Sequence, residues 1–181
     1  MLSVGWVGWT VDDSGRPDPG STERARFERT YEEDWLAVFR LATAWTNDRD
    51  AAEDIAQETF MRLWHHRTTF DWEHPALPWL LVTARHLCAS RFRALKRLVS
   101  LARANPTVHE LAVSDGDRSG TDRWIDTKRA MARLAPRERA ALIGVEVIGL
   151  STAEAGLVLG VTDGAVRALI SRARRKLGED A

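Results

Sequence analysis

The chain has 181 residues, of which 44% are hydrophobic and 29% charged, a composition that fits a folded globular protein rather than a disordered one. A single cysteine, Cys88, excludes an internal disulfide framework and a cysteine-based zinc site. No apolar segment approaches the ~20 residues that span a bilayer, and the first residues lack the basic and apolar regions of a signal peptide. We therefore expect a cytoplasmic protein that does not insert into a membrane.

The charges sum to zero but are sorted along the chain. Residues 1–78 carry 15 acidic and eight basic side chains, whereas residues 79–109 carry six basic and no acidic ones. An acidic stretch follows over 110–126, and residues 127–181 carry ten bases and six acids. Two basic regions with an acidic spacer are typical of a protein that holds a polyanion at two places. Two solvated helix faces would give the same pattern.

Two helices are predicted before residue 67. Residues 1–22 mix Gly, Pro, Asp and Ser without a helical or strand period, so we expect a mobile tail there. Apolar residues at three- and four-residue steps then predict a helix over 23–45. A second helix is expected to begin at Asp50, with Glu53 completing a capping-box pair.

A loop and a third helix complete the first predicted domain, residues 23–98. Pro75 and Pro78 interrupt a helix and predict the loop, and a helix with a basic stripe follows over 79–98. Residues 99–121, which include NPT and SDGDRSG, are typical of a flexible linker. The buried side of the third helix is expected to contain Leu80, Ala84, Leu87, Cys88 and Leu95.

Four further helices are expected in a second domain, residues 122–181. Pro136 suits a first helical turn, and Ser151 and Asp163 suit N-caps. Gly160 suits the end of a helix. The expected ranges are 122–134, 136–149, 151–160 and 163–177. Because no alternating strand pattern occurs, the sequence predicts an all-α fold of two small helical domains joined by a flexible linker.

Residues 151–177 have the layout of a helix-turn-helix, in which a short capped helix, a Gly-containing turn and a second helix follow one another. Arg167, Ser171 and Arg174 lie on one side of the second helix. Its apolar stripe contains Val166, Ile170, Ala173 and Leu177. A recognition helix needs this arrangement, because one face packs on its domain while the other offers arginine to base edges and phosphates. The alternative is a plain amphipathic helix whose arginines favour the negative end of the helix dipole.

The C-terminal segment resembles the promoter-binding domain of extracytoplasmic-function (ECF) sigma factors. It reads LAPRERAALIGVEVIGLSTAEAGLVLGVTDGAVRALISRARRKL. The first domain of that family is similar to two earlier segments, TNDRDAAEDIAQETFMRLWHH and PWLLVTARHLCASRFRALKR. The resemblance spans about 25–177, in the family's order and spacing. Gly156 stands where the family has Ala, and this glycine is expected to loosen its helix by about 1 kcal/mol. Other departures, whose effect on specificity the sequence leaves open, are His86, Ser90, Ala165, Ala168 and Leu169.

The resemblance implies a protein that is not an enzyme and needs no cofactor or metal. It would bind core RNA polymerase at the clamp and flap regions, bind and open promoter DNA, and be held by an anti-sigma factor. The implied polymerase-binding residues are Asp54, Gln57, Glu58 and Arg62. The implied promoter-opening contacts are Phe70, Trp72, His74, Arg85, His86, Arg93, Lys96 and Arg97. The implied contacts to the upstream promoter element are Thr162, Gly164, Arg167, Ser171, Arg172, Arg174, Arg175 and Lys176.

Other interpretations remain open at this point. A stand-alone helix-turn-helix regulator is the alternative function. Trp72 could simply cover the core instead of meeting DNA. Cys88 fits a small core residue better than a redox sensor. The adjacent His65 and His66 do not share a helix face, which argues against a metal site.

Overall fold

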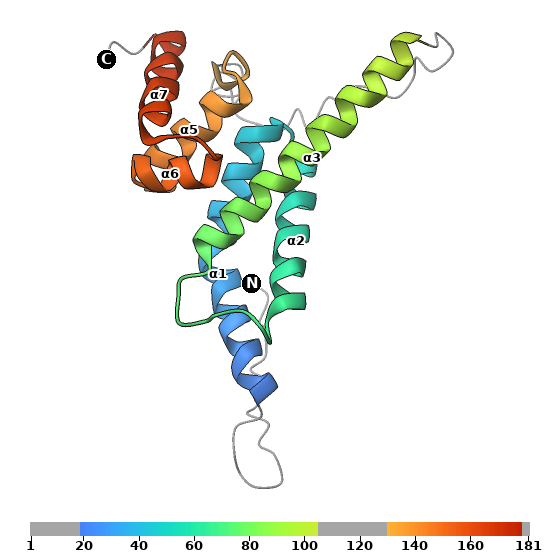
Figure 1. The fold of residues 1–181 in the computed structure, drawn as a ribbon, viewed down its shortest axis with the longest axis vertical. Helices are drawn as coiled ribbons and strands as arrows, with labels where there is room; N and C mark the ends of the chain where they lie inside the picture. Colours follow the sequence, from blue (N-terminus) through green and yellow to red (C-terminus); the bar gives the residue numbers. More distant parts are fainter. Residues whose placement is uncertain (1–18, 105–129, 179–181) are drawn as a thin grey trace, which may run out of the picture.

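The computed structural model describes residues 19–104 and 130–178, and within these ranges it contains helices and loops but no strand (Figure 1). The expectation of an all-α fold is confirmed. The helices whose two ends both lie within the described residues are α1 (Pro19–Thr46), α2 (Arg49–His66), α3 (Leu77–Ala104), α5 (Pro136–Glu146), α6 (Thr152–Leu159) and α7 (Asp163–Leu177). None of them is long and apolar enough to cross a membrane. Most of the expected tail, linker and 122–134 helix lies outside the described residues.

The cap of α2 differs from the prediction. Asn47 ends α1 with a left-handed backbone (φ 55°), so the chain turns before Asp48. Asp48 is extended, and its side chain accepts a hydrogen bond from the Ala51 N–H at 3.1 Å. Asp50 therefore lies in the first helical turn and is not the cap. The expected cap at Asp163 is also wrong. Thr162 caps α7, and Asp163 is the first residue of the helix.

Helix α3 is longer at both ends than predicted. Pro78 lies in its first turn, where the missing N–H of proline has no helical partner to lose. At the other end the helix continues to Ala104, because no proline follows until Pro106. Its second half extends beyond the body of the protein (Figure 1). Leu95, which was expected to be buried, is consequently 51% exposed.

The buried side chains of both domains form one continuous hydrophobic core. Helices α1, α2 and α3 pack together, and α5 and α6 lie against α1 and α3 (Figure 1). Leu41, Leu63 and Leu80 are fully buried in the first domain, and Val166 is fully buried in the second. The helix-turn-helix is therefore docked on the first domain in this structure.

The helix-turn-helix requires a glycine at position 156. A Cβ added to Gly156 would lie 2.9 Å from the backbone oxygen of Val161, a distance that real Cβ atoms essentially never reach. The Val161 N–H in turn donates to the Gly156 oxygen at 3.0 Å. Besides its low helix propensity, Gly156 thus permits the close approach of α6 to the turn that precedes α7.

We predict that Gly156→Ala lowers the free energy of unfolding by about 1–3 kcal/mol, because the backbone of the turn must shift. Gly164→Ala is the matched control. An added Cβ there meets nothing within 4 Å, so the alanine is expected to raise stability by up to about 1 kcal/mol. Urea unfolding followed by circular dichroism measures both effects. Equal stability of the parent and Gly156→Ala would contradict the close approach.

Candidate nucleic-acid interface

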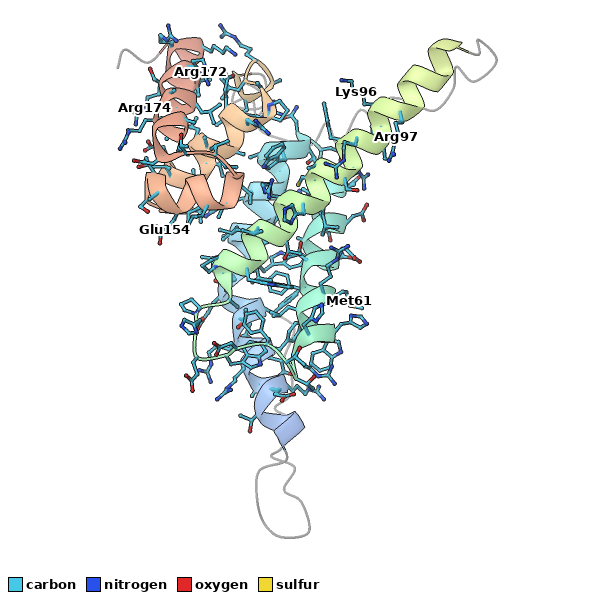
Figure 2. All side chains as sticks on the ribbon, viewed as in Figure 1. Met61, Lys96, Arg97, Glu154, Arg172 and Arg174 are labelled. Carbon is cyan, nitrogen blue, oxygen red and sulfur yellow. The ribbon has the colours of Figure 1, made fainter. Side chains whose placement is uncertain are left out.

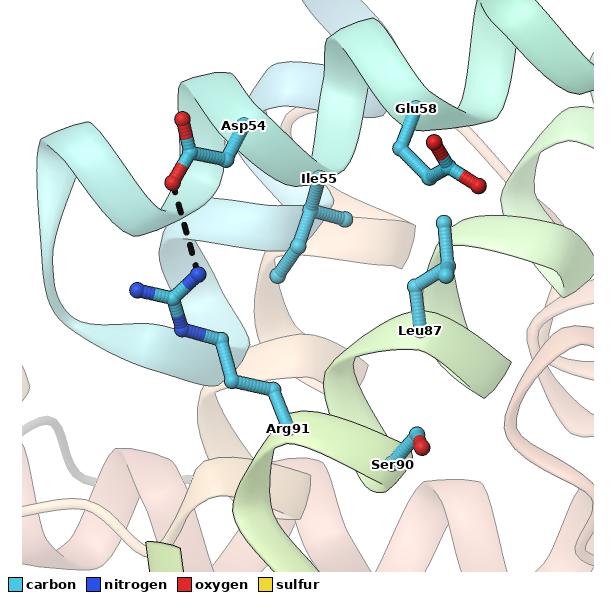
Figure 3. A pocket seen from close by; sticks show the side chains of 6 residues that line it. All are labelled: Asp54, Ile55, Glu58, Leu87, Ser90 and Arg91. Carbon is cyan, nitrogen blue, oxygen red and sulfur yellow. Dashed lines mark hydrogen bonds and ion pairs between the residues drawn. The ribbon is translucent and has the colours of Figure 1, made fainter. Parts of the chain in front are cut away.

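The outer face of α2 carries all four residues expected to bind polymerase. Asp54, Gln57, Glu58 and Arg62 are exposed, because the opposite face of the helix is buried in the core. Arg62 Nε lies 2.9 Å from Glu58 Oε1. A hollow of about 280 Å³ lies between α2 and α3, lined by Asp54, Ile55, Glu58, Leu87, Ser90 and Arg91 (Figure 3). Two acids, Asp54 and Glu58, and the basic Arg91 thus surround the apolar side chains of Ile55 and Leu87.

Arg91 is a neighbour of this face that sequence reasoning missed. Its Nη1 lies 3.4 Å from Asp54 Oδ2, across the hollow from α3 to α2 (Figure 3). The two side chains are 45% and 68% exposed, so the pair is a weak surface contact. Residues 37 positions apart have no spacing signal in the sequence.

The loop between α2 and α3 is built on two aromatic side chains. The rings of Phe70 and Trp72 are 5.0 Å apart, and Phe70 also lies 5.7 Å from Trp79. Trp72 Nε1 donates to the Arg67 oxygen at 2.8 Å. Both aromatic residues are half-buried against the core. Trp72 therefore covers the core, which is one of the two roles that the sequence allows.

The tip of this loop is exposed and polar. His74 Nδ1 lies 2.8 Å from Asp71 Oδ2, and the His74 side chain is 78% exposed. A hydrogen bond from the Glu73 backbone N–H, together with the His74 ring, holds the pKa of Asp71 below its ordinary value. His74 thus contacts Asp71 through one ring nitrogen, while its ring remains open to solvent.

The residues of α3 that were expected to open the promoter lie in two different environments. Arg85 lies against the turn of the helix-turn-helix, since a Cβ on Gly160 would be 3.4 Å from Arg85 Nη1. His86 beside it is exposed. The second half of α3 exposes the remaining three, Arg93, Lys96 and Arg97, the last two labelled in Figure 2. Arg97 lies roughly 28 Å along the helix from Pro78, so these residues do not form one compact surface with the loop.

Local sequence signals position the helix-turn-helix. Ser151 and Glu154 form a reciprocal capping box at the start of α6, and Gly160 ends it in the left-handed conformation (φ 66°). Thr162 then caps α7 by accepting from the Ala165 N–H at 3.3 Å. These expected signals at Ser151 and Gly160 are confirmed.

Helix α7 has a buried face and a basic outer face, as expected. The buried residues are Val166, Leu169, Ile170 and Ala173. Leu169 stands where the resembling family has arginine, and its burial means that it packs on the domain. Of the residues expected to bind DNA, Arg174 is half-buried. The others are exposed, namely Thr162, Gly164, Arg167, Ser171, Arg172, Arg175 and Lys176. Three of these bases, Arg172, Arg175 and Lys176, line a hollow of about 320 Å³.

Acidic side chains contact four of the bases on α7. Arg167 Nη2 lies 2.5 Å from Asp163 Oδ2 within the helix. Arg174 Nη2 lies 2.7 Å from Glu146 Oε1 of α5. The other two bases, Arg172 and Lys176, approach Glu138 of α5 at 3.7 and 2.7 Å. Neither Glu138 nor Glu146 was expected from the sequence, because the spacing of apolar residues predicts the faces of one helix but not its contacts with another helix.

Comparison with known proteins identifies both domains. Residues 31–98 match the family model of Sigma-70 region 2, and residues 126–177 match that of Sigma-70 region 4. The chain is 31% identical over 164 residues to the ECF RNA polymerase sigma factor SigC of Mycobacterium tuberculosis, covering 90% of this chain and 84% of that relative. It belongs to the ECF sigma factors.

Further relatives of this sigma factor agree with the assignment. It is 30% identical to SigL of Mycobacterium tuberculosis, over 87% of this chain and 89% of that one. Its fold is similar to that of the sigma factor RpoE from Bartonella quintana, solved with the anti-sigma factor NepR. That match has 26% identity and a TM-score of 0.68 and covers 83% of this chain and 93% of the other. CnrH, solved with the cytosolic domain of CnrY, matches at 25% identity and a TM-score of 0.58, over 86% of each chain.

The single cysteine of the sigma factor is part of its core. Cys88 is 3% exposed, and burial raises the pKa of its thiol to about 12. The thiolate is the reactive form of cysteine. At pH 8 the folded protein therefore holds Cys88 as a protonated, shielded thiol.

We predict that iodoacetamide at pH 8 modifies Cys88 only after the protein is unfolded, as measured by mass spectrometry with and without denaturant. The matched control carries Cys88→Ala and Ser90→Cys, which moves the thiol two residues along α3 to an exposed position. That control is expected to react in the folded state. Rapid labelling of native Cys88 would contradict its assignment to the core.

Proposed function

We propose that this sigma factor binds core RNA polymerase through the outer face of α2 and directs it to promoters whose upstream element is read by α7. The observation that supports this best is the match to sigma regions 2 and 4 in the family's order, over 31–98 and 126–177. The outer faces of the two helices have the charge that these roles need, acidic on α2 and basic on α7. No enzymatic step is part of the proposal.

The α2 face suits a basic partner surface. Asp54 and Glu58 lie on the rim of the hollow between α2 and α3, and Ile55 and Leu87 line it from the two helices (Figure 3). A partner helix with an apolar side chain between two bases would fill such a surface. Charges at an interface rim mainly set orientation and association rate. The polymerase clamp is the partner that the family membership implies.

Charge reversal tests this surface. We predict that Asp54→Lys with Glu58→Lys weakens association with core polymerase roughly tenfold, the effect of about 1.4 kcal/mol, because two attractive rim charges become repulsive. The control, Glu32→Lys with Glu33→Lys, makes the same charge change on exposed residues of α1. Binding is measured by fluorescence anisotropy, with unfolding midpoints as a check on folding. Equal loss in both variants would remove α2 from the interface.

The loop tip and the second half of α3 suit promoter opening. Strand separation needs side chains that capture an unstacked base, and exposed rings and polar groups can do so. His74 is the open ring of the loop, and Arg93 and Lys96 supply charge for the phosphates. Arg85 can join them only after α6 moves away from α3, because the turn at Gly160 lies against its guanidinium.

His74 gives a cleaner test of opening than the half-buried Phe70 and Trp72, whose removal would also disturb the core. We predict that His74→Ala leaves promoter binding by the holoenzyme nearly unchanged but reduces strand separation. Permanganate reactivity of unpaired thymines measures the separation. Thr69→Ala, an exposed neighbour in the same loop, is the control. Undiminished reactivity in His74→Ala would exclude this ring from base capture.

The basic face of α7 suits the upstream element. Arg167 and Ser171 lie on the exposed side near the middle of the helix, where a side chain in the major groove reaches base edges. Thr162 and Gly164 expose the start of the helix, whose backbone N–H groups can meet a phosphate. The bases near its end, Arg172, Arg175 and Lys176, are placed for phosphates.

Co-purification distinguishes this function from that of a stand-alone regulator. A sigma factor should bring core polymerase with it, whereas an independent regulator should bind its DNA without polymerase. The solved relatives RpoE and CnrH are bound to NepR and to part of CnrY, of which NepR is an anti-sigma factor. We therefore include an anti-sigma factor among the proposed partners.

A further inference from the structure

Two carboxylates of α5 lie beside the two edges of the buried stripe of α7. With 100° between successive helical residues, Arg172 and Lys176 lie on one side of that stripe and Arg174 lies on the other. Glu138 contacts the first pair, and Glu146 contacts Arg174. Figure 2 labels Arg172 and Arg174 on α7. The two acids thus serve different edges of the same helix and can be altered separately.

Glu138 is held more firmly than Glu146. Its side chain is 6% exposed, whereas that of Glu146 is 45% exposed. Glu138 Oε2 accepts from the Ala135 N–H at 2.8 Å and from Lys176 Nζ at 2.7 Å. Its other oxygen lies 3.7 Å from Arg172 Nε. The hydrogen bond from Lys176 holds the pKa of Glu138 below its ordinary value, so the carboxylate is ionised at neutral pH.

The two bases remain open on the side away from Glu138. Arg172 and Lys176 are 47% and 46% exposed, and with Arg175 they line the hollow at the end of α7. Long basic side chains lose rotamer freedom when they bind, and a side chain that is already held loses less. The ion pairs with Glu138 therefore reduce the rotamer freedom that Arg172 and Lys176 would lose when they bind a phosphate on their exposed side.

We propose that Glu138 is a positioning residue, whose carboxylate holds Arg172 and Lys176 as one pre-oriented pair of phosphate ligands at the edge of the recognition helix. This inference rests on the proposed promoter-binding function of α7. It names the DNA backbone at the end of α7 as the ligand of the hollow. Glu138 itself does not touch the DNA.

A purely structural role is the competing explanation, because Glu138 also caps α5. Glu138→Gln separates the two roles. The glutamine oxygen can still accept from the Ala135 N–H, so the cap is retained. The negative charge that holds Arg172 and Lys176 is lost. Glu146→Gln is the matched control, since it makes the same change on the same helix but releases only Arg174 on the other edge.

The experiment uses the reconstituted holoenzyme and a promoter duplex in which one upstream phosphate at a time is replaced by a neutral methylphosphonate. In the parent, neutralising a phosphate bound by a charged side chain should weaken binding about tenfold. Lys176→Ala identifies the phosphate that this lysine contacts, because its penalty disappears there. For each variant the penalty is the ratio of its affinities for the unmodified and the methylphosphonate duplex. A general gain in affinity for DNA on loss of an acid affects both affinities and therefore cancels.

We expect Glu138→Gln to reduce the penalty at the Lys176 phosphate to about threefold or less, while Glu146→Gln leaves it at the parent value. Glu138→Asp is a second variant, which keeps the charge but withdraws it from both bases, and it should reduce the penalty too. An unchanged penalty in folded Glu138→Gln would overturn the proposal and leave Glu138 as a cap. If the parent holoenzyme fails to bind any promoter, the proposed function itself fails, which is a different result.

Discussion

The buried guanidinium of Arg139 is the interaction on which the arrangement of the two domains depends. Arginine keeps its charge, so burying it requires acceptors for its N–H groups. Arg139 is 7% exposed, and its Nε donates to the Ala44 oxygen of α1 at 2.7 Å. Its Nη1 donates to the oxygens of Leu134 and Met131 at 2.8 and 3.2 Å. The Arg139 side chain therefore joins α5 to the residues just before it, Met131 and Leu134, and to α1 of the first domain.

That anchoring decides which functional side chains are open at the same time. With α5 and α6 against α1 and α3, the outer faces of α2 and α7 remain exposed, so the acids proposed to bind polymerase and the bases proposed to bind DNA are accessible together. Arg85 is different, because Gly160 lies over its guanidinium. The docked domains therefore leave the proposed DNA-contacting bases of α7 open but cover Arg85, one of the residues proposed for promoter opening.

The sequence predicted the helices from local patterns, misplaced two helix caps by one or two residues, and missed the contacts between helices that lie far apart in the chain. Ser151 and Gly160 carry their own capping signals, so the helix-turn-helix was predictable. The start of α2 was misplaced because Asp48 and Asp50 are both suitable N-caps, and the turn at Asn47 makes Asp48 the one that is extended. Arg91 and Glu138 were missed because their partners lie 37 and 38 residues away. The polymerase-binding and DNA-binding residues themselves remain predictions.

Core-dependent transcription on a library of genomic fragments tests the central claim most directly. Purified core polymerase is incubated with the fragments with and without this sigma factor, and the transcripts are sequenced. The account predicts new transcripts only when the chain is present, from fragments that share an upstream sequence. Fragments bound equally well without polymerase, with no transcript that depends on the chain, would contradict it.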